Sequence, residues 1–376
     1  MKRKIIEVST DTNIGGAGKC LITLLENFDY SKFDVKVILP PNSLLKPLIE
    51  RLRIQVIEVH GIAEKSLDIK SIRALRRIFK DEKPDLVHTH ASMSARIAAR
   101  QAGAKVVYTR HSVFPPSKYL THFPGKQING FFNNHYADGI IAVAEAAKDN
   151  LTDTGVNPNK ISVILNGVDG LEPLPESERK EIKERFGVKD GETVISIVAR
   201  LEEVKGHNYF IEAAYLLLKE GINAKFFIAG TGSCESTLRE RVRVMGLEDK
   251  IIFTGFIPDV DKLMNITDIQ VNASYGTEAT SLALLEGMSL GVPAVVSDFG
   301  GNPGVIKDGK NGFVVAKQNS AALMVGIKKL IEDKQLYKEM SENSIEIFRN
   351  TFTAGAMTHN TEELYERVMN GNIGSK

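Results

Sequence analysis

The stretch that decides the fold is Thr193–Val198, with the sequence Thr-Val-Ile-Ser-Ile-Val, and the loop that follows it. Five of its six residues are β-branched, which predicts a buried strand. The loop carries two cations, Arg200 and Lys205. Lys4–Ser9 begins the chain in a similar way and leads to a glycine-rich loop. These two similar beginnings predict two copies of one architecture.

Short β-branched runs alternate with longer amphipathic stretches along most of the chain, which is typical of parallel sheets with crossover helices. The strand-like runs of the first half are Lys4–Ser9, Val35–Leu39, Leu86–Thr89, Val106–Tyr108 and Gly139–Val143. Those of the second half are Thr193–Val198, Ala224–Ala229, Ile251–Thr254, Ile269–Asn272 and Ala294–Ser297. We therefore expect an α/β protein with two Rossmann-like, doubly wound parallel-sheet domains facing each other across a cleft.

Length and charge agree with two domains. The chain has 376 residues, of which 43% are hydrophobic and 25% charged, as in ordinary globular proteins. Residues 1–170 contain 24 Lys and Arg against 17 Asp and Glu, whereas the remainder contains 24 against 30. This change of sign predicts a boundary near residue 170, with a linker at Leu171–Glu178. The basic first half favours contact with anionic lipid or an anionic polymer. It lacks the basic-aromatic motifs of nucleic-acid binding.

The sequence predicts a cytoplasmic protein. No apolar run approaches the roughly 20 residues that span a bilayer, and Met1–Lys4 leads directly into a strand without a signal-peptide core. Cys20 and Cys234 lack metal-ligand spacing and are too few for a disulfide framework.

Two segments of the first half have surface character. Leu67–Lys83 has helical periodicity, with Ile69, Ile72, Leu75 and Phe79 expected inward and Lys70, Arg73, Arg77 and Lys80 outward. This basic face is either simply solvated or rests on a membrane. Residues 114–132 mix aromatic side chains with Lys118 and Lys126, and we expect a long, ligand-binding loop there.

Two glutamates, Glu278 and Glu286, lie eight residues apart in Gly276–Gly287, which is expected to form the first two turns of a helix. Eight helical residues rise roughly 12 Å, farther than the about 5–9.5 Å that separates glycosidase carboxylate pairs. The two carboxylates therefore suit separate hydroxyl groups of one long ligand. Between them, the amides of 279–282 at the helix start suit a diphosphate. The alternative is a turn residue followed by a solvated helix face.

The glycine-rich loop Gly15–Lys19 follows the first strand, where the backbone must approach a phosphate or sugar closely. A Walker loop fails because Asn13 and Cys20 stand where Gly and Ser or Thr are required. The dinucleotide-binding motif GxGxxG is not satisfied either, because Leu21 stands where its third Gly is required. These departures weaken the ATPase and dehydrogenase hypotheses.

Other candidate residues follow predicted strands. Arg200 and Lys205 could offset the charge of a departing diphosphate, although loop cations are commonly only solvated. His88, His90 and His111 end or follow strands, and could contact sugar hydroxyls or serve as structural residues. His-x-His without a third nearby ligand is weak support for zinc. Asp259 and Asp261 resemble a metal-binding pair, but Asp259 more simply caps a helix.

Motifs in one order along nearly the whole chain closely resemble those of the family-four (GT4) retaining glycosyltransferases, which have the GT-B fold. They are the glycine-rich first loop, Pro84–His90, Thr109–His111, Ile164–Asp169, Arg200–Gly206, Gly230–Gly232, Phe253–Phe256, Glu278–Glu286 and Gly291–Pro293. One departure lies beside the predicted donor sugar, where the chain has Ala279-Thr280-Ser281 in place of the family's Gly-Phe-Gly or a similar sequence. This exchange leaves the donor sugar open.

The resemblance implies an acceptor-binding domain at 1–170, to which a C-terminal helix at about 354–376 returns, and a donor-binding domain at 171–353. It implies that Arg200 and Lys205 bind the donor diphosphate, that Glu286 binds the ribose, and that Glu278 binds the donor sugar. The implied donor-binding set also contains Gly16, Gly230, Ala279, Thr280, Ser281 and Leu282. His111 is implied to lie beside the reacting sugar, which makes His111, Arg200, Lys205 and Glu278 the catalytic set. No metal or cofactor is expected.

The function so implied is transfer of a hexosyl unit, with retention, from a nucleoside diphosphate sugar to an acceptor hydroxyl. A UDP-sugar is favoured and a GDP-sugar comes next. The acceptor is a glycan, a lipid-linked glycan or a small hydroxylated molecule, with a role in surface polysaccharide or glycolipid synthesis and possible peripheral contact with a membrane. The alternatives are a nucleotide-sugar epimerase on the same fold and a catalytically idle nucleotide-sugar sensor.

Overall fold

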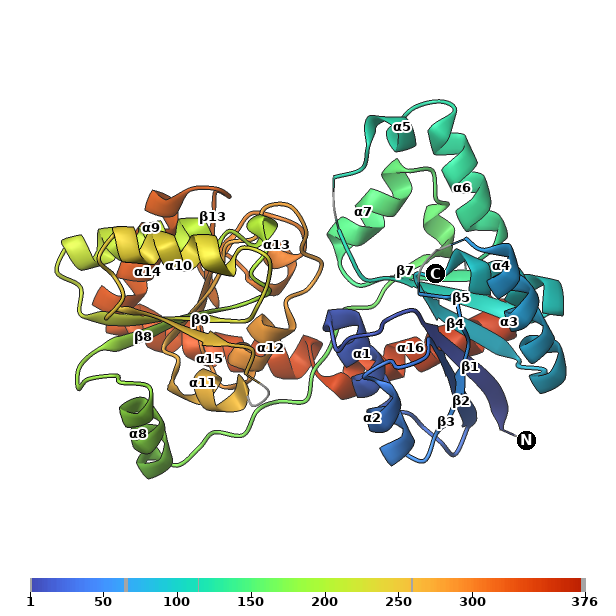
Figure 1. Cartoon of the computed structure of the whole chain (residues 1–376), viewed down its shortest axis with the longest axis horizontal. Coiled ribbons are helices and arrows are strands. Elements are labelled where there is room, and N and C mark those ends of the chain that lie inside the picture. The colour runs from blue at the N-terminus through green and yellow to red at the C-terminus, as the bar shows by residue number, and fades with distance from the viewer. Residues whose placement is uncertain (1, 64–66, 114, 258–259, 373–376) are drawn as a thin grey trace. The chain divides into compact units, whose positions relative to one another are not determined.

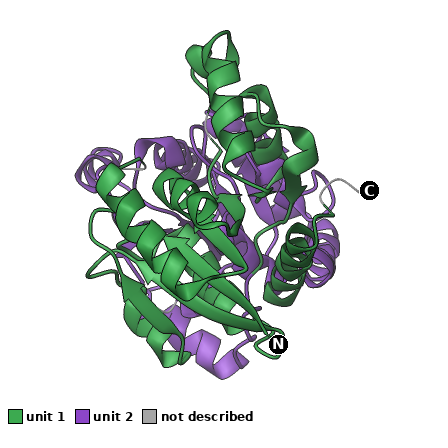
Figure 2. Ribbon diagram, turned by 90° about the vertical axis from the view of Figure 1, so that its right-hand side faces the viewer, with its two compact units in different colours: residues 1–167, 354–376 green, residues 168–353 purple. Residues whose placement is uncertain are grey.

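The computed structural model describes residues 2–63, 67–113, 115–257 and 260–372. The chain forms two structural units, Met1–Gly167 with Ala354–Lys376 and Val168–Thr353, called unit 1 and unit 2 below. Figure 2 colours the two units separately. Unit 1 therefore contains both ends of the chain, and the predicted boundary at residue 170 lies close to this division.

Unit 1 contains a seven-stranded parallel sheet in the order β3-β2-β1-β4-β5-β6-β7, with helices on both faces (Figure 1). Its strands are β1 (Arg3–Ser9), β2 (Phe33–Leu39), β3 (Gln55–Glu58), β4 (Leu86–His90), β5 (Lys105–Arg110), β6 (Gly139–Ala142) and β7 (Ile161–Val163). Its helices are α1 (Gly16–Glu26), α2 (Lys46–Arg51), α3 (Ile69–Glu82), α4 (Met93–Ala102), α5 (Lys118–Thr121), α6 (Gly125–His135), α7 (Glu145–Asp153) and α16 (Ala354–Met369), with a 3-10 turn, η1 (Pro158–Lys160). Helices cover both faces, which agrees with the burial of all five residues of β4 and of residues 5–9 of β1.

Unit 2 contains a six-stranded parallel sheet in the order β10-β9-β8-β11-β12-β13. Its strands are β8 (Thr193–Val198), β9 (Ala224–Ala229), β10 (Ile251–Gly255), β11 (Ile269–Asn272), β12 (Ala294–Ser297) and β13 (Gly312–Val315). Its helices are α8 (Glu176–Arg185), α9 (His207–Lys219), α10 (Glu235–Val244), α11 (Val260–Ile266), α12 (Leu282–Ser289), α13 (Asn302–Val305), α14 (Ser320–Glu332) and α15 (Lys334–Thr351), with a 3-10 turn, η2 (Glu203–Lys205). Residues of β8, β9, β11, α9 and α14 form its main hydrophobic core.

Each sheet reverses its strand order once, between β1 and β4 in unit 1 and between β8 and β11 in unit 2. In doubly wound sheets, ligands bind beyond the carboxyl ends of the strands at such a reversal. The sequence predicted two doubly wound sheets, and this prediction is confirmed. It missed β3, β7 and β13, which are all short edge strands with little buried surface. Their weak apolar patterns explain the omission.

Two predictions about the surface of unit 1 were wrong in part. Helix α3 begins at Ile69, which is 66% exposed, while Asp68 caps the helix by accepting a hydrogen bond from the amide of Ser71 at 2.7 Å. The periodicity had placed Ile69 inward because it took no account of the cap. The expected long loop instead holds α5 and α6, and Phe114 lies outside the described residues. No helix in the described ranges combines the length and apolar character needed to cross a membrane.

Gly206 sets the path of the loop after β8. Its φ is +73°, and an added Cβ would lie 2.1 Å from the carbonyl oxygen of Ala273, which follows β11. A side chain at this position would therefore push the two loops apart. Gly246 offers a comparison, because its φ is +65° and an added Cβ there would meet nothing within 4 Å.

We predict that Gly206→Ala destabilises unit 2 by about 3 kcal/mol or more, against about 1 kcal/mol for Gly246→Ala, because only the first adds a steric clash to the positive φ. Thermal unfolding of both variants, monitored by calorimetry, measures the difference. Equal melting temperatures would contradict the close approach of the two loops.

Candidate active site

The loops at the strand-order reversal of unit 2 bring together two of the predicted residues. Lys205 ends η2 after β8, and Glu278 lies in the loop after β11. The Lys205 Nζ donates to Glu278 Oε2 at 2.9 Å and to the carbonyl oxygen of Thr277 at 2.9 Å. Because β8 and β11 are neighbours, their carboxyl-end loops are adjacent. The fold thus pairs residues that are 73 positions apart.

The Glu278 carboxylate is held by more than this ion pair. Asn272 Nδ2 and Ser274 Oγ each donate to Glu278 Oε2 at 3.1 Å. Glu278 is 8% exposed, so the donors compensate for the loss of its hydration. Asn272 and Ser274 were not predicted, because no motif in the sequence distinguishes them from other strand-end polar residues.

The segment around Glu278 differs from its predicted form. Helix α12 begins at Leu282, so Glu278 lies in the loop before the helix and not in its first turn. Ser281 caps α12, and its hydroxyl accepts from the amide of Leu284 at 3.4 Å. A polar capping side chain competes with the helical conformation and fixes the start of the helix there. Glu286 lies inside α12 and is half-buried.

The remaining predicted residues of unit 2 lie in the carboxyl-end loops after β8, β9 and β11, or at the start of α12. Arg200 follows β8 and is exposed. Gly230 follows β9 with a φ of +138°, and an added Cβ would lie 2.1 Å from the carbonyl oxygen of Ala199. Gly230 is therefore needed for the close packing of two loops, whatever ligand they bind. Ala279 is buried, and Thr280 and Leu282 are half-buried.

Gly16 and His111 belong to unit 1. Gly16 is the first residue of α1 and is exposed, and a Cβ added there would meet nothing within 4 Å. His111 follows β5. Both lie beyond the carboxyl ends of their strands, at the edge of the sheet where doubly wound domains bind ligands. Asp259 of the considered metal pair lies outside the described residues.

A buried cluster connects His111 to the centre of the unit 1 sheet. Glu7 pairs with His88 in the register of β1 and β4, and His90 pairs with Thr109 in the register of β4 and β5. The His90 Nδ1 lies 2.7 Å from His111 Nε2. The three histidines were candidate residues from the sequence, but Glu7 was not. The charge of Glu7 within an apolar strand was the available signal.

Glu7 is the acceptor at the centre of this cluster. Its Oε2 lies 2.9 Å from His88 Nδ1 and 3.1 Å from His90 Nε2, and its Oε1 accepts from the Tyr365 hydroxyl at 2.7 Å. Burial acts to raise the pKa of Glu7, but His88 and His90 outweigh burial, so the pKa lies below its usual range. Burial lowers the pKa of His88. Burial, followed by the effect of His90, lowers the pKa of His111 well below its usual value.

Glu7, His88 and His90 also have the composition of a metal site, since their ligand atoms lie within 4.8 Å of one another. The third ligand that the sequence did not reveal is therefore present. These atoms are already engaged in hydrogen bonds with one another, and Tyr365 contacts both Glu7 and His88. The arrangement is that of a satisfied buried network.

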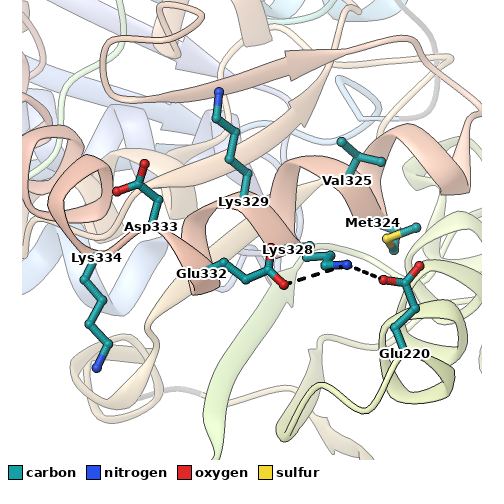
Figure 3. A pocket seen from close by; sticks show the side chains of 8 residues that line it. All are labelled: Glu220, Met324, Val325, Lys328, Lys329, Glu332, Asp333 and Lys334. Carbon is teal, nitrogen blue, oxygen red and sulfur yellow. Dashed lines mark hydrogen bonds and ion pairs between the residues drawn. The ribbon is translucent and has the colours of Figure 1, made fainter.

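A surface hollow of about 820 Å³ lies elsewhere on unit 2 (Figure 3). It is lined by the ends of α9 and α14, including Glu220 and Lys328, at the edge of the sheet where the strands begin. Lys328 lies 2.6 Å from Glu220 and 3.7 Å from Glu332, so its charge is already paired. The hollow also lies at the opposite edge of the sheet from the loops around Glu278, away from the carboxyl ends of the strands where doubly wound domains bind ligands.

Comparison with known proteins identifies the family. Residues 14–170 match the model described as Glycosyltransferase Family 4, and residues 178–347 match Glycosyl transferases group 1. The UDP-Gal:alpha-D-GlcNAc-diphosphoundecaprenol alpha-1,3-galactosyltransferase of Escherichia coli is 31% identical over 316 residues, which cover 79% of each chain. The chain belongs to the family-four glycosyltransferases, as the sequence motifs predicted.

Solved structures have the same fold. A crystal structure of a glycosyltransferase from Rickettsia africae has a TM-score of 0.85 at 21% identity, covering 98% of this chain and 99% of the other. The crystal structure of Anabaena Alr3699/HepE in complex with UDP has a TM-score of 0.83 at 22% identity, covering 97% and 100%. The fold is GT-B, which confirms the predicted fold class.

His207 follows the Lys205 loop and is 2% exposed, and neither of its ring nitrogens has a hydrogen-bond partner among the described residues. Burial, followed by the charge of Lys205, lowers the pKa of His207 from 6.5 to about 4. The unfolded chain binds this proton near pH 6.5 and the folded chain only near pH 4. The stability that comes from neutral His207 is therefore complete above pH 6.5 and is lost as the pH falls toward 4.

We predict that His207→Leu reduces the acid sensitivity of the protein, by up to about 3 kcal/mol of unfolding free energy between pH 6.5 and 4. Melting temperatures measured across this range should fall less steeply for the variant than for the wild type. His359→Leu, at an exposed position of α16, is the matched control and should keep the wild-type slope. If the melting temperature of His207→Leu fell with pH as steeply as that of the wild type, His207 would not be the cause of the acid sensitivity.

Proposed function

We propose that the protein is a retaining, metal-independent glycosyltransferase that moves a hexosyl unit from a nucleoside diphosphate sugar to an acceptor hydroxyl. The observation that carries this proposal is the pairing of Lys205 with Glu278 before α12 at the strand-order reversal of unit 2. A cation, a carboxylate and a helix start together suit a diphosphate joined to a sugar. The names of the Escherichia coli and Anabaena proteins, one a UDP-galactose transferase and one bound to UDP, favour a UDP-sugar.

Most of the predicted residues have a role in this reaction. Arg200 and Lys205 stabilise the charge that develops on the diphosphate as its bond to the sugar C1 breaks. Glu286 binds the ribose, and Glu278 accepts hydrogen bonds from the sugar hydroxyls. The amides of 279–282 contact phosphate and sugar, and Gly16 allows close approach of the diphosphate.

The transfer step is a same-face exchange at C1. The acceptor oxygen forms the new C1–O bond on the face from which the diphosphate leaves, and the leaving diphosphate takes the proton of the acceptor hydroxyl. No side chain is required as a covalent nucleophile. The anomeric configuration of the product, measured by NMR, tests this step: an inverted product would contradict it.

The acceptor is proposed to be a glycan or lipid-linked glycan of surface polysaccharide or glycolipid synthesis. Tyr119, Phe123 and Phe131, on and beside α5 and α6, are 60%, 82% and 62% exposed, and Lys118, the first residue of α5, is also exposed. Aromatic and basic groups together suit the surface of an anionic bilayer. Cosedimentation with anionic vesicles should exceed that with neutral vesicles and should fall in Phe123→Ser/Phe131→Ser; equal binding to both would count against membrane contact at the cytoplasmic face.

The two alternatives, a nucleotide-sugar epimerase and a catalytically idle nucleotide-sugar sensor, can be tested directly. An epimerase would convert the donor without any acceptor, whereas a transferase would show at most slow hydrolysis. A sensor would bind the donor without turnover. Family membership favours the transferase over both.

We predict that one nucleoside diphosphate sugar, a UDP-sugar first and a GDP-sugar next, raises the melting temperature in the presence of EDTA. A ligand at 100 times its dissociation constant stabilises the folded state by roughly 2.7 kcal/mol. Glu286→Ala should abolish the shift, because the variant lacks the proposed ribose contact. No shift with any nucleotide sugar, or a shift only with added metal, would contradict the proposal.

We further predict that Arg200→Ala lowers kcat by about 100-fold or more, as expected for loss of a group that stabilises the transition state. Lys334→Ala, which removes an exposed lysine from the hollow in Figure 3, is the control and should leave kcat unchanged. If Lys334→Ala lost activity and Arg200→Ala did not, the reaction would take place at the hollow of Figure 3, and the proposed site would be wrong.

A further inference from the structure

The buried cluster of unit 1 connects the last helix of the chain to His111. The Tyr365 hydroxyl, on α16, contacts Glu7 at 2.7 Å and His88 Nδ1 at 2.6 Å, and Tyr365 is fully buried. The His88 Nε2 lies 2.6 Å from the Thr109 hydroxyl. Tyr365, His88 and His90, which contact Glu7, are therefore each hydrogen-bonded to another member of the cluster.

The protons of this cluster can be assigned from Glu7 outward. An ionised carboxylate only accepts hydrogen bonds. Tyr365 Oη and His90 Nε2 must therefore each carry the proton that faces Glu7. Because the single hydroxyl proton of Tyr365 is donated to Glu7, His88 Nδ1 must also carry a proton, which it donates to Tyr365 Oη. Burial raises the pKa of Tyr365 well above its ordinary value, so its hydroxyl keeps its proton. The remaining nitrogen of neutral His88 accepts from Thr109, which is consistent with the short distance between them.

The same reasoning extends to His111. An uncharged His90 ring with its proton on Nε2, facing Glu7, has only a lone pair on Nδ1. The contact of 2.7 Å between His90 Nδ1 and His111 Nε2 then requires that His111 donates. The His111 Nδ1 is left as an acceptor, and this buried atom has no hydrogen-bond partner among the described residues. An unpaired buried acceptor is costly unless a ligand supplies the donor.

We propose that Glu7 and Tyr365 are positioning residues, which fix His111 as its Nε2-protonated form through His90, so that His111 Nδ1 accepts a hydrogen bond from a substrate sugar hydroxyl. This inference rests on the proposed function for the identity of the ligand. It assigns a role to the first strand and the last helix of the chain, both of which lie in unit 1.

The neutral form of His111 also suits the reaction. A sugar that loses its diphosphate develops positive charge at C1. Two like charges that lie close together in a protein interior repel each other. A protonated His111 would thus oppose the reaction, whereas an uncharged acceptor orients the sugar without this repulsion. Burial of His111 and the effect of its neighbour His90 both lower the pKa of His111, which favours the uncharged ring.

NMR of the full-length protein labelled with 15N-histidine tests the assignment, because protonated and unprotonated ring nitrogens have well-separated chemical shifts. His111→Asn identifies the His111 signals. The proposal predicts an unprotonated Nδ1 and a protonated Nε2 for His111 in the wild type. Glu7→Gln and Tyr365→Phe should shift His111 toward the Nδ1-protonated form. A protonated Nδ1 in the wild type, or signals unchanged in both variants, would overturn the proposal.

Kinetics separates positioning from folding. Glu7→Gln should lower kcat about tenfold, the cost of one lost hydrogen bond, while the dissociation constant for UDP stays within about twofold. Tyr30→Phe is the matched control, since the Tyr30 hydroxyl contacts the Leu25 carbonyl oxygen at 2.5 Å and its ring packs on Phe28, as that of Tyr365 does. It should retain both the wild-type kcat and the wild-type His111 signals. A loss of kcat in Tyr30→Phe equal to that in Tyr365→Phe would overturn the proposal.

Failure of the proposed function can be distinguished from failure of the His111 assignment. If no nucleotide sugar is turned over by the wild type, the proposed function fails, yet the NMR result still decides the protonation of His111. Stoichiometric zinc in the purified protein would overturn the inference in another way, because a metal held by Glu7, His88 and His90 would need lone pairs on ring nitrogens where the assignment places protons.

Discussion

The buried ion pair between Lys205 and Glu278 is the interaction on which the candidate donor site depends. Removing both charges from water is expensive, and the pair is sustained only because Asn272, Ser274 and the Thr277 carbonyl group complete its hydrogen bonds. The strand order supplies these partners, since β8 and β11 are adjacent where the sheet reverses. Under the proposed function, an arriving diphosphate adds a second anion beside Lys205 and leaves Glu278 able to engage the sugar.

Much of the fold could be predicted from the sequence because parallel strands buried on both faces have strong apolar signals. Thr193–Val198 and Ala224–Ala229 match β8 and β9 at both ends. The edge strands β3, β7 and β13 escaped because half-exposed strands lack that signal. Helix α3 was predicted, but the position of Ile69 was not, because a hydrogen bond to the Asp68 side chain determines where the helix begins.

The candidate site was predictable in its residue types and less so in its geometry. Family motifs pointed to Lys205 and Glu278, and the structure pairs them. The start of α12 was misplaced, because the capping hydroxyl of Ser281 fixes it after Glu278. The contact of Glu7 with Tyr365 could not be predicted, since it joins residues 358 positions apart and depends on the return of α16 to the sheet of unit 1.

Hydrogen–deuterium exchange with and without saturating UDP tests the location of the donor site most directly. The account predicts slower exchange of the amides in 199–206 and 279–284, where the carboxyl-end loops and the start of α12 lie, with no change in 324–334 around the hollow of Figure 3. Protection confined to 324–334, with the two loops unchanged, would contradict it.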